Sequence, residues 1–204
     1  MKIKICGLRD MANIKDVATY NPDYMGFICY DRSPRYISDM HVETFNSLSQ
    51  KIVKTAVFVN ETAENIDKLI EKFGFDAIQL HGNESPEFCE SFKNKVTVIK
   101  AFGVDDSFDF AQLEAYKNSV DFFMFDTKTP AHGGSGQVFN WNILNKYTLD
   151  IPFFLSGGLS LENLPAIKQI THPAFYAVDL NSRFEIEPGL KDINRLKQAF
   201  ELLR

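Results

Sequence analysis

Residues 55–82 read TAVFVNETAENIDKLIEKFGFDAIQLHG and contain one strand–helix–strand unit. Thr55–Val59 and Ala77–Leu80 are short apolar runs with β-branched or aromatic residues, which is typical of strands. Between them, Asn60–Phe73 has the periodicity of an amphipathic helix, with an apolar stripe formed by Ile66, Leu69, Ile70 and Phe73. Gly74 follows where a helix commonly ends. This pattern is typical of two parallel strands joined by a helix.

The same alternation extends along the whole chain. Strand-like runs occur at Ile3–Cys6, Tyr24–Ile28, Thr55–Val59, Ala77–Leu80, Thr97–Phe102, Phe122–Phe125, Phe153–Ser156 and Phe175–Asp179. Further helices are expected over Ser160–Ile170, with Ser160 as N-cap, and near Lys191–Leu203. Eight strands alternating with helices predict an α/β fold, a single-domain (β/α)8 TIM barrel over residues 1–204. The alternative, an open doubly wound sheet, usually has fewer strands, and no GxGxxG turn follows the first strand here.

Composition narrows the class of function. Hydrophobic residues make up 45% of the chain and charged residues 24%, as in an ordinary globular protein. The net charge of −5 argues against a nucleic-acid partner, which needs a basic surface. No apolar run is long enough to span a bilayer, and Lys2 and Lys4 interrupt any signal-peptide core, so we expect no membrane partner. We expect a monomer rather than a dimer.

The cysteines and histidines do not form a recognisable metal pattern. Three cysteines are widely spaced without a CxxC pair, which favours a reduced, cytoplasmic protein. Four histidines are scattered along the chain. The sequence therefore predicts no metal site.

Polar side chains gather at the carboxyl ends of the expected strands, where catalytic groups of a barrel lie. Cys6 ends the first strand, Gln79 and His81 end the fourth, Asp126 the sixth and Asp179 the eighth. Side chains alternate between the two faces of a strand. If the apolar neighbours of Lys4 and Cys6 pack against the helices, Lys4 and Cys6 face the barrel interior. By the same reasoning, Gln79 and His81 lie on the inner face. Several of these side chains should share one mouth of the barrel.

Glycine-rich loops follow the sixth and seventh strands and read HGGSGQVFNW (132–141) and SGGLS (156–160). Such loops let backbone N–H groups close on an anion. A phosphate site after strands seven and eight recurs in these barrels, and DLNSRFE (179–185) follows strand eight. The candidate phosphate ligands are Gly134, Ser135, Gly157, Gly158, Asn181 and Ser182.

An ordered set of short motifs now identifies a resemblance. It runs through KICGL (4–8), SPRYI (33–37), FVN (58–60), QLHG (79–82), FDT (125–127), GGSG (133–136), SGGLSLEN (156–163), DLNSRFE (179–185) and PGLKD (188–192). Each motif alone is weak, but their joint order and spacing are specific. The chain resembles the phosphoribosylanthranilate isomerases of tryptophan biosynthesis from Lys4 to Asp192.

The resemblance implies a cofactor-free Amadori rearrangement of a small-molecule substrate. N-(5-phosphoribosyl)anthranilate would become 1-(2-carboxyphenylamino)-1-deoxyribulose 5-phosphate. By matching motifs, Cys6 would be the general base and Asp126 the general acid, while Arg35 would hold the anthranilate moiety. Gln79, His81 and Asp179 are further candidates for substrate contact.

The chemistry requires these residue types in particular states. A thiol acts as a base only as thiolate, so Cys6 needs a lowered pKa or an electropositive setting. Asp126 must hold a proton when substrate binds, which favours a partly desolvated carboxyl. Two positions depart from the family pattern: Ser156 stands where alanine is frequent, and Arg183 where glycine is frequent. Both departures concern the phosphate loops rather than the acid and base.

Other functions remain alternatives at this stage. A ribulose-phosphate epimerase would need clustered histidine and aspartate ligands for a metal, which the chain lacks. An indole-glycerol-phosphate synthase would need an inward lysine acid, for which Lys4 is a candidate, but Cys6 and the SPR motif would then be unexplained. A silent phosphate-binding barrel would keep the glycine loops and could lose Cys6 or Asp126, yet both are present.

Overall fold

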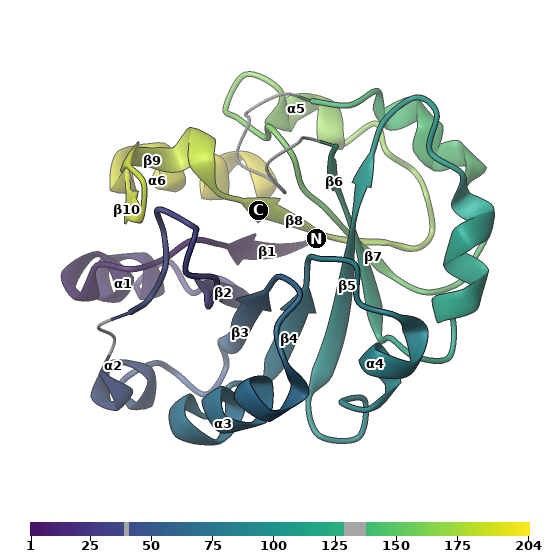
Figure 1. The fold of residues 1–204 in the computed structure, drawn as a ribbon. Coiled ribbons are helices and arrows are strands. Elements are labelled where there is room, and N and C mark those ends of the chain that lie inside the picture. The colour runs from purple at the N-terminus through teal and green to yellow at the C-terminus, as the bar shows by residue number, and fades with distance from the viewer. Residues whose placement is uncertain (39–40, 129–137) are drawn as a thin grey trace.

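The fold is a closed barrel of eight parallel strands, as seen in a computed structural model that describes residues 1–38, 41–128 and 138–204. Strands occupy the centre of the molecule and helices surround them (Figure 1). In chain order the strands are β1 (Lys2–Ile5), β2 (Tyr24–Ile28), β3 (Val53–Phe58), β4 (Ala77–Leu80), β5 (Thr97–Val104), β6 (Phe122–Thr127), β7 (Phe153–Leu155) and β8 (Phe175–Leu180). The predicted strands are confirmed, with ends that differ by one or two residues.

Pairing follows sequence order, and β8 closes the barrel by pairing with β1. Lys4 lies opposite Asp179 in that pair and opposite Tyr24 of β2 on the other side. The barrel thus has no sheet edge, and the open-sheet alternative is wrong.

The connections are short helices of two kinds. The α-helices are α1 (Met11–Ala18), α2 (Val42–Asn46), α3 (Ala63–Phe73), α4 (Pro86–Glu90), α5 (Leu164–Ile167) and α6 (Ile193–Leu203). The 3₁₀ helices are η1 (Phe110–Tyr116), η2 (Trp141–Lys146) and η3 (Ser182–Phe184). A small hairpin, β9 (Glu185–Glu187) with β10 (Leu190–Lys191), separates η3 from α6.

Local capping decides where the predicted helices begin and end. α3 starts later than expected because the Thr62 side chain accepts a hydrogen bond from the Asn65 N–H, and it ends at Gly74, whose φ is +61°. α6 starts after Lys191 because the Asp192 carboxylate caps the backbone N–H groups of Asn194 and Arg195.

The helix expected over Ser160–Ile170 is wrong in extent, and Ser160 is not its N-cap. The helix covers Leu164–Ile167 alone. Pro165 lacks an N–H and fits the first turn of a helix, not its middle. The Asn163 side chain accepts from the Ser160 N–H and donates to the Gly158 carbonyl, so residues 158–163 form a loop that this amide stabilises.

The barrel interior has an apolar layer with a polar layer above it. The apolar layer consists of Tyr24, Ile99, Ala101, Met124, Phe154 and Ala177. Two residues further along the same strands, after Met124, Phe154 and Ala177, come Asp126, Ser156 and Asp179. Because the side-chain period of a strand is two, both sets face inward. The polar groups therefore meet at the carboxyl end of the barrel.

A second, larger core lies between the strands and the helices. Phe153 is fully buried there, with ring centroids 5.1 Å from Phe125, 5.6 Å from Tyr147 and 5.6 Å from Phe175. These aromatic contacts join three neighbouring strands to the segment before β7, so the outer core fixes the barrel wall that carries Asp126.

We expect Phe153→Ala to lower the free energy of unfolding by about 3–5 kcal/mol, because it removes a buried ring and leaves a cavity. Urea unfolding followed by circular dichroism measures this. Ile186→Ala is the control, since Ile186 is 70% exposed and its loss should change stability by less than about 0.5 kcal/mol. Equal unfolding midpoints for Phe153→Ala and wild type would contradict the packing described.

Candidate active site

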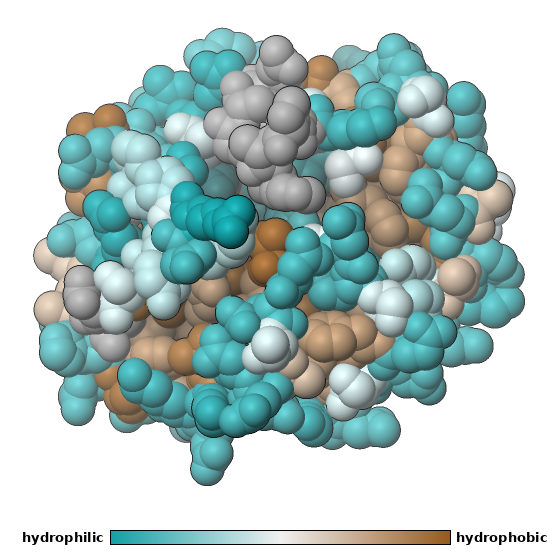
Figure 2. All heavy atoms as spheres, viewed as in Figure 1, coloured by the Kyte–Doolittle hydropathy of each residue, from teal (hydrophilic) through white to brown (hydrophobic). Residues whose placement is uncertain are grey.

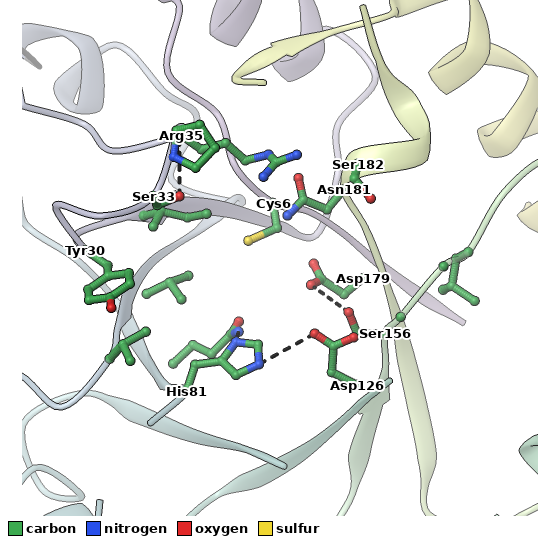
Figure 3. Close-up of a pocket in the computed structure, with 18 of the residues that line it drawn as sticks. Cys6, Tyr30, Ser33, Arg35, His81, Asp126, Ser156, Asp179, Asn181 and Ser182 are labelled. Carbon is green, nitrogen blue, oxygen red and sulfur yellow. Dashed lines mark hydrogen bonds and ion pairs between the residues drawn. The ribbon is translucent and has the colours of Figure 1, made fainter. Parts of the chain in front are cut away.

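A cavity of about 350 Å³ opens at the carboxyl end of the barrel. It brings together every predicted site residue that the structure describes, namely Cys6, Arg35, Gln79, His81, Asp126, Gly157, Gly158, Asp179, Asn181 and Ser182. Figure 3 shows the Cys6 sulfur, which follows β1, and the Asp126 carboxyl, which lies on β6, pointing into this cavity. Gly134 and Ser135 lie outside the described residues.

One wall of the cavity is apolar, which the sequence reasoning missed. It is formed by Ile28, Tyr30, Val57 and Val59, while Leu159, after β7, lies on the opposite side of the barrel. The face seen in Figure 2 accordingly carries apolar residues near its centre, framed by hydrophilic side chains. Sequence position could have predicted this wall, because its residues lie at the carboxyl ends of β2 and β3 or directly after them.

Lys4 lies inside the barrel and is fully buried. Its Nζ donates hydrogen bonds to Gln79 Oε1 at 2.8 Å and to Asp179 Oδ1 at 2.9 Å. Burial lowers the pKa of Lys4, but its charge and hydrogen-bond interactions with Asp179 and its interaction with Cys6 outweigh this effect, and the net shift is upward. Lys4 is therefore a charged ammonium group. It does not line the cavity, which removes the acid that a synthase of the indole-glycerol-phosphate class would need.

Cys6 follows β1 directly, and its backbone N–H donates to the Leu180 carbonyl at 3.0 Å. Gly26 leaves room for the sulfur, because a Cβ at that position would lie 2.7 Å from Cys6 Sγ. Burial raises the pKa of the Cys6 thiol, Lys4 opposes the shift, and the net change is upward. The expected electropositive setting is present, but the pKa is not lowered in the free protein.

Asp126 lies near the end of β6 and is almost completely buried. Burial and then the charge of Asp179 raise its pKa to about 7. Its Oδ1 accepts the backbone N–H of Thr127 at 2.8 Å, and its Oδ2 lies 3.5 Å from His81 Nε2. The side chain is thus the desolvated carboxyl that an acid role requires.

Gln79 and His81 form a pair at the end of β4. Gln79 Nε2 lies 3.0 Å from His81 Nδ1, while the other end of the amide contacts Lys4. In Figure 3 the His81 ring points toward Asp126. The pair consequently links the buried lysine to the carboxyl at the cavity.

Arg35 lies in the loop after β2 and reaches Glu185, which begins β9. Its Nε donates to both carboxylate oxygens, at 2.9 and 3.0 Å, and its Nη2 donates to Oε2 at 2.6 Å. Lys191 Nζ also donates to Glu185 Oε1, at 2.8 Å. Burial raises the pKa of Glu185, but the Arg35 hydrogen bonds and the Lys191 charge outweigh it, and the net shift is downward.

The role of Glu185 was missed, although its residue stands in the DLNSRFE motif. The motif places Glu185 four residues after the candidate Asn181, but only the folded hairpin brings it to Arg35. The structure therefore holds the Arg35 guanidinium in one orientation at the rim of the cavity.

The loop after β7 approaches the acid closely. Gly157 has φ +89° and Gly158 has φ +66°, conformations that favour glycine. A Cβ at Gly157 would also lie 2.4 Å from the Thr127 nitrogen and 2.8 Å from Asp126 Oδ1. The two glycines thus let the backbone of this loop reach the site. Arg183 is exposed, in η3 after β8.

Within residues 1–38, 41–128 and 138–204, no three or more histidine, cysteine, aspartate or glutamate side chains are grouped as metal ligands would be. No helix in these ranges is both long and apolar enough to cross a membrane.

Comparison with known proteins places this geometry in a family. The family model for N-(5'-phosphoribosyl)anthranilate (PRA) isomerase matches residues 3–202. An N-(5'-phosphoribosyl)anthranilate isomerase of Parabacteroides distasonis is 44% identical over 204 residues, covering 98% of this chain and 92% of the relative.

Solved structures agree. The phosphoribosyl anthranilate isomerase of Thermotoga maritima has a TM-score of 0.85 and 32% identity, covering 99% of this chain and 98% of the other. Another such isomerase, in complex with reduced 1-(o-carboxyphenylamino)-1-deoxyribulose 5-phosphate, has a TM-score of 0.81 and 28% identity, with 98% and 97% covered. The barrel, its cavity and these matches lead to one conclusion: the chain belongs to the phosphoribosylanthranilate isomerase family.

Proposed function

We propose that the protein converts N-(5-phosphoribosyl)anthranilate to 1-(2-carboxyphenylamino)-1-deoxyribulose 5-phosphate by an Amadori rearrangement, with Asp126 as general acid and Cys6 as general base. The observation that carries this proposal is the pKa of Asp126, raised to about 7, in a cavity that also presents a thiol. A carboxyl that keeps its proton near neutrality can act as an acid there. The solved relative in complex with the reduced product supports this choice of substrate.

Asp126 acts in the first step. Its proton passes to the ribose ring oxygen, the bond between that oxygen and C1 breaks, and the anilino nitrogen supplies electrons to form a protonated Schiff base. Asp126 is left as a carboxylate. The Thr127 N–H on its Oδ1 supports the charge that develops.

Cys6 acts in the second step. Its thiolate removes the proton from C2, and the electrons of that bond form the enolamine. The enolamine becomes the ketone by gaining a proton at C1 and losing the proton of its 2-hydroxyl group, and exchange with water then removes the proton from Cys6 and restores the one on Asp126. Lys4 and Lys191 oppose the effect of burial on the Cys6 pKa, and so favour the thiolate. No electron acceptor is needed because the rearrangement is internal, so we propose that no cofactor and no metal take part.

The two ends of the substrate are proposed to bind at different walls. The phosphate would contact the loops after β7 and β8, at Gly157, Gly158, Asn181 and Ser182, together with Gly134 and Ser135 beyond the described residues. The anthranilate ring would lie on the apolar wall, with its carboxylate at Arg35. Gln79, His81 and Asp179 would complete the site around the sugar.

The setting of the enzyme is part of the same proposal. We propose one barrel domain over residues 1–204, a cytoplasmic location, and a small-molecule substrate without nucleic-acid or membrane partners. The monomeric state expected from the sequence stays a prediction.

Turnover of the labile substrate tests the reaction directly. The substrate is formed in place from anthranilate and phosphoribosyl pyrophosphate by a transferase, and its consumption is followed by fluorescence against spontaneous decay. Consumption well above that decay supports the proposal. A folded protein that consumes none would favour a barrel that only binds phosphate.

We expect Cys6→Ser to lose about 10²–10⁴-fold in kcat, because a serine hydroxyl is a far weaker base than a thiolate. The measurement is the same fluorescence assay. Cys29→Ser is the matched control, since Cys29 is a buried thiol that does not line the cavity, and it should keep its kcat. Near-wild-type kcat in Cys6→Ser would remove Cys6 from the mechanism.

The raised pKa values of Asp126 and Cys6 together predict how kcat/KM depends on pH. The reaction needs Asp126 protonated and Cys6 ionised in one molecule, yet the Asp126 pKa, about 7, lies below that of Cys6. Below about pH 7 Asp126 keeps its proton while the thiolate fraction grows with pH, so kcat/KM should rise. Above about pH 7 the loss of the Asp126 proton offsets the gain in thiolate, so kcat/KM should level off.

Asp126→Asn should lose about 10²–10⁴-fold in kcat and also lose this break near pH 7, because the amide cannot donate the proton. A pH profile of kcat/KM for both proteins measures it. A break that persists unchanged in Asp126→Asn would assign the ionisation to another group.

We expect Arg35→Ala to raise KM about 10- to 100-fold with little change in kcat, because it removes a charged hydrogen bond to the substrate carboxylate. Steady-state kinetics separate the two constants. Arg204→Ala is the control, since Arg204 does not line the cavity and donates hydrogen bonds to the Tyr20 and Asn21 carbonyls. An unchanged KM in Arg35→Ala would rule out the contact.

A further inference from the structure

Four side chains form a continuous row from the barrel interior to the cavity. Lys4 Nζ lies 2.8 Å from Gln79 Oε1, and Gln79 Nε2 lies 3.0 Å from His81 Nδ1. His81 Nε2 then lies 3.5 Å from Asp126 Oδ2. Lys4, Gln79 and Asp126 are nearly or fully buried, so these contacts are shielded from water. Such shielding makes the direction of each hydrogen bond matter.

The Lys4 ammonium group decides which atom donates and which accepts in each contact of the row. An ammonium group has donors only, so the Gln79 atom beside Lys4 must be the amide oxygen. The amide nitrogen then faces His81, and it too can only donate. His81 Nδ1 must therefore accept, and the proton of the neutral ring lies on Nε2. In a ring protonated on both nitrogens, the Nδ1–H would face the N–H of the Gln79 amide, and neither group could accept a hydrogen bond.

Two N–H donors consequently face the carboxyl of Asp126. Its Oδ1 faces the Thr127 N–H and its Oδ2 faces the His81 Nε2–H. Neither neighbour offers a lone pair to the proton of the neutral acid. That proton stays available to a group in the cavity. With the ring proton on Nδ1 instead, the Nε2 lone pair would face the carboxyl and take the proton.

We propose that Lys4 and Gln79 are positioning residues, which hold His81 in the Nε2–H form so that Asp126 donates its proton to the substrate alone. This rests on the proposed role of Asp126 as general acid. When the proton passes to the ring oxygen and the bond from that oxygen to C1 breaks, the carboxylate left behind accepts the His81 N–H. The same arrangement therefore leaves the proton of the neutral acid available and stabilises the carboxylate that forms.

Nitrogen-15 NMR of the resting protein reads the ring state directly. At mildly alkaline pH a histidine is neutral, and its two ring nitrogens give different shifts according to which one carries the proton. His81→Asn identifies the His81 signals among those of the four histidines. We expect the wild-type protein to carry the proton on Nε2.

Gln79→Glu keeps the shape of the side chain but replaces the amide donor that faces His81 with an acceptor. The carboxylate still accepts from Lys4, but it presents an acceptor to His81 Nδ1, which should gain the proton. We expect the NMR signals to report protonation at Nδ1, and kcat to fall about 10²-fold with KM changed by less than about threefold. Gln198→Glu is the matched control, because Gln198 is an exposed residue of α6 outside the cavity and should leave both readouts at wild-type values.

The outcomes separate cleanly. A wild-type ring with its proton on Nδ1 overturns the proposal, as does Gln79→Glu with unchanged kcat. If Gln79→Glu fails to fold, the wild-type spectrum still decides, and Gln79→Met, which offers no donor, should show a mixture of both ring forms. A protein with the expected ring states but no turnover would support the proposed roles of Lys4 and Gln79 in orienting His81, and would contradict the proposed function instead.

Discussion

The site depends on one buried charge, the Lys4 ammonium inside the barrel. Removing a charged group from water is costly unless paired and hydrogen-bonded, and here Asp179 and Gln79 supply the partners. Asp179 lies opposite Lys4 in the strand pair that closes the barrel, so closure of the barrel brings the two charges together. The same ammonium opposes the effect of burial on the Cys6 thiol and orients the Gln79 amide. The Lys4 ammonium group thus takes part both in the strand pair that closes the barrel and in the electrostatics of the site.

The second constraint is that the acid and the base need opposite protonation states in one small cavity. Burial raises the pKa of both Asp126 and Cys6, which suits the acid and hinders the base. Positive charge beneath the cavity partly offsets this for the thiol. Desolvation is the leading cause of the raised pKa of this carboxyl, and the charge of Asp179 is the second. In its neutral Nε2–H form, His81 adds no positive charge beside Asp126 that would lower this pKa.

Arg35 illustrates how an acidic protein can present positive charge locally. Its guanidinium is held by the Glu185 carboxylate, which Lys191 also contacts. The two cations share one carboxylate, so this corner retains a net positive charge although the chain carries −5 overall. Together with the glycines after β7, whose backbone approaches Asp126 within contact distance, this gives the cavity two ends that suit anions.

The sequence by itself determined the barrel, its strands, and the inward side of Lys4, Cys6, Gln79 and His81, because alternation along a strand and strand–helix order are local properties. It also yielded the motifs of the isomerase family. It could not place the α5 helix, where Pro165 and the Asn163 hydrogen bonds overrode apolar periodicity. Nor could it reveal that Arg35 meets Glu185, or that Lys4 directs the His81 ring. Those contacts join residues 75 to 175 positions apart, and only the closed barrel with its β9–β10 hairpin brings them together.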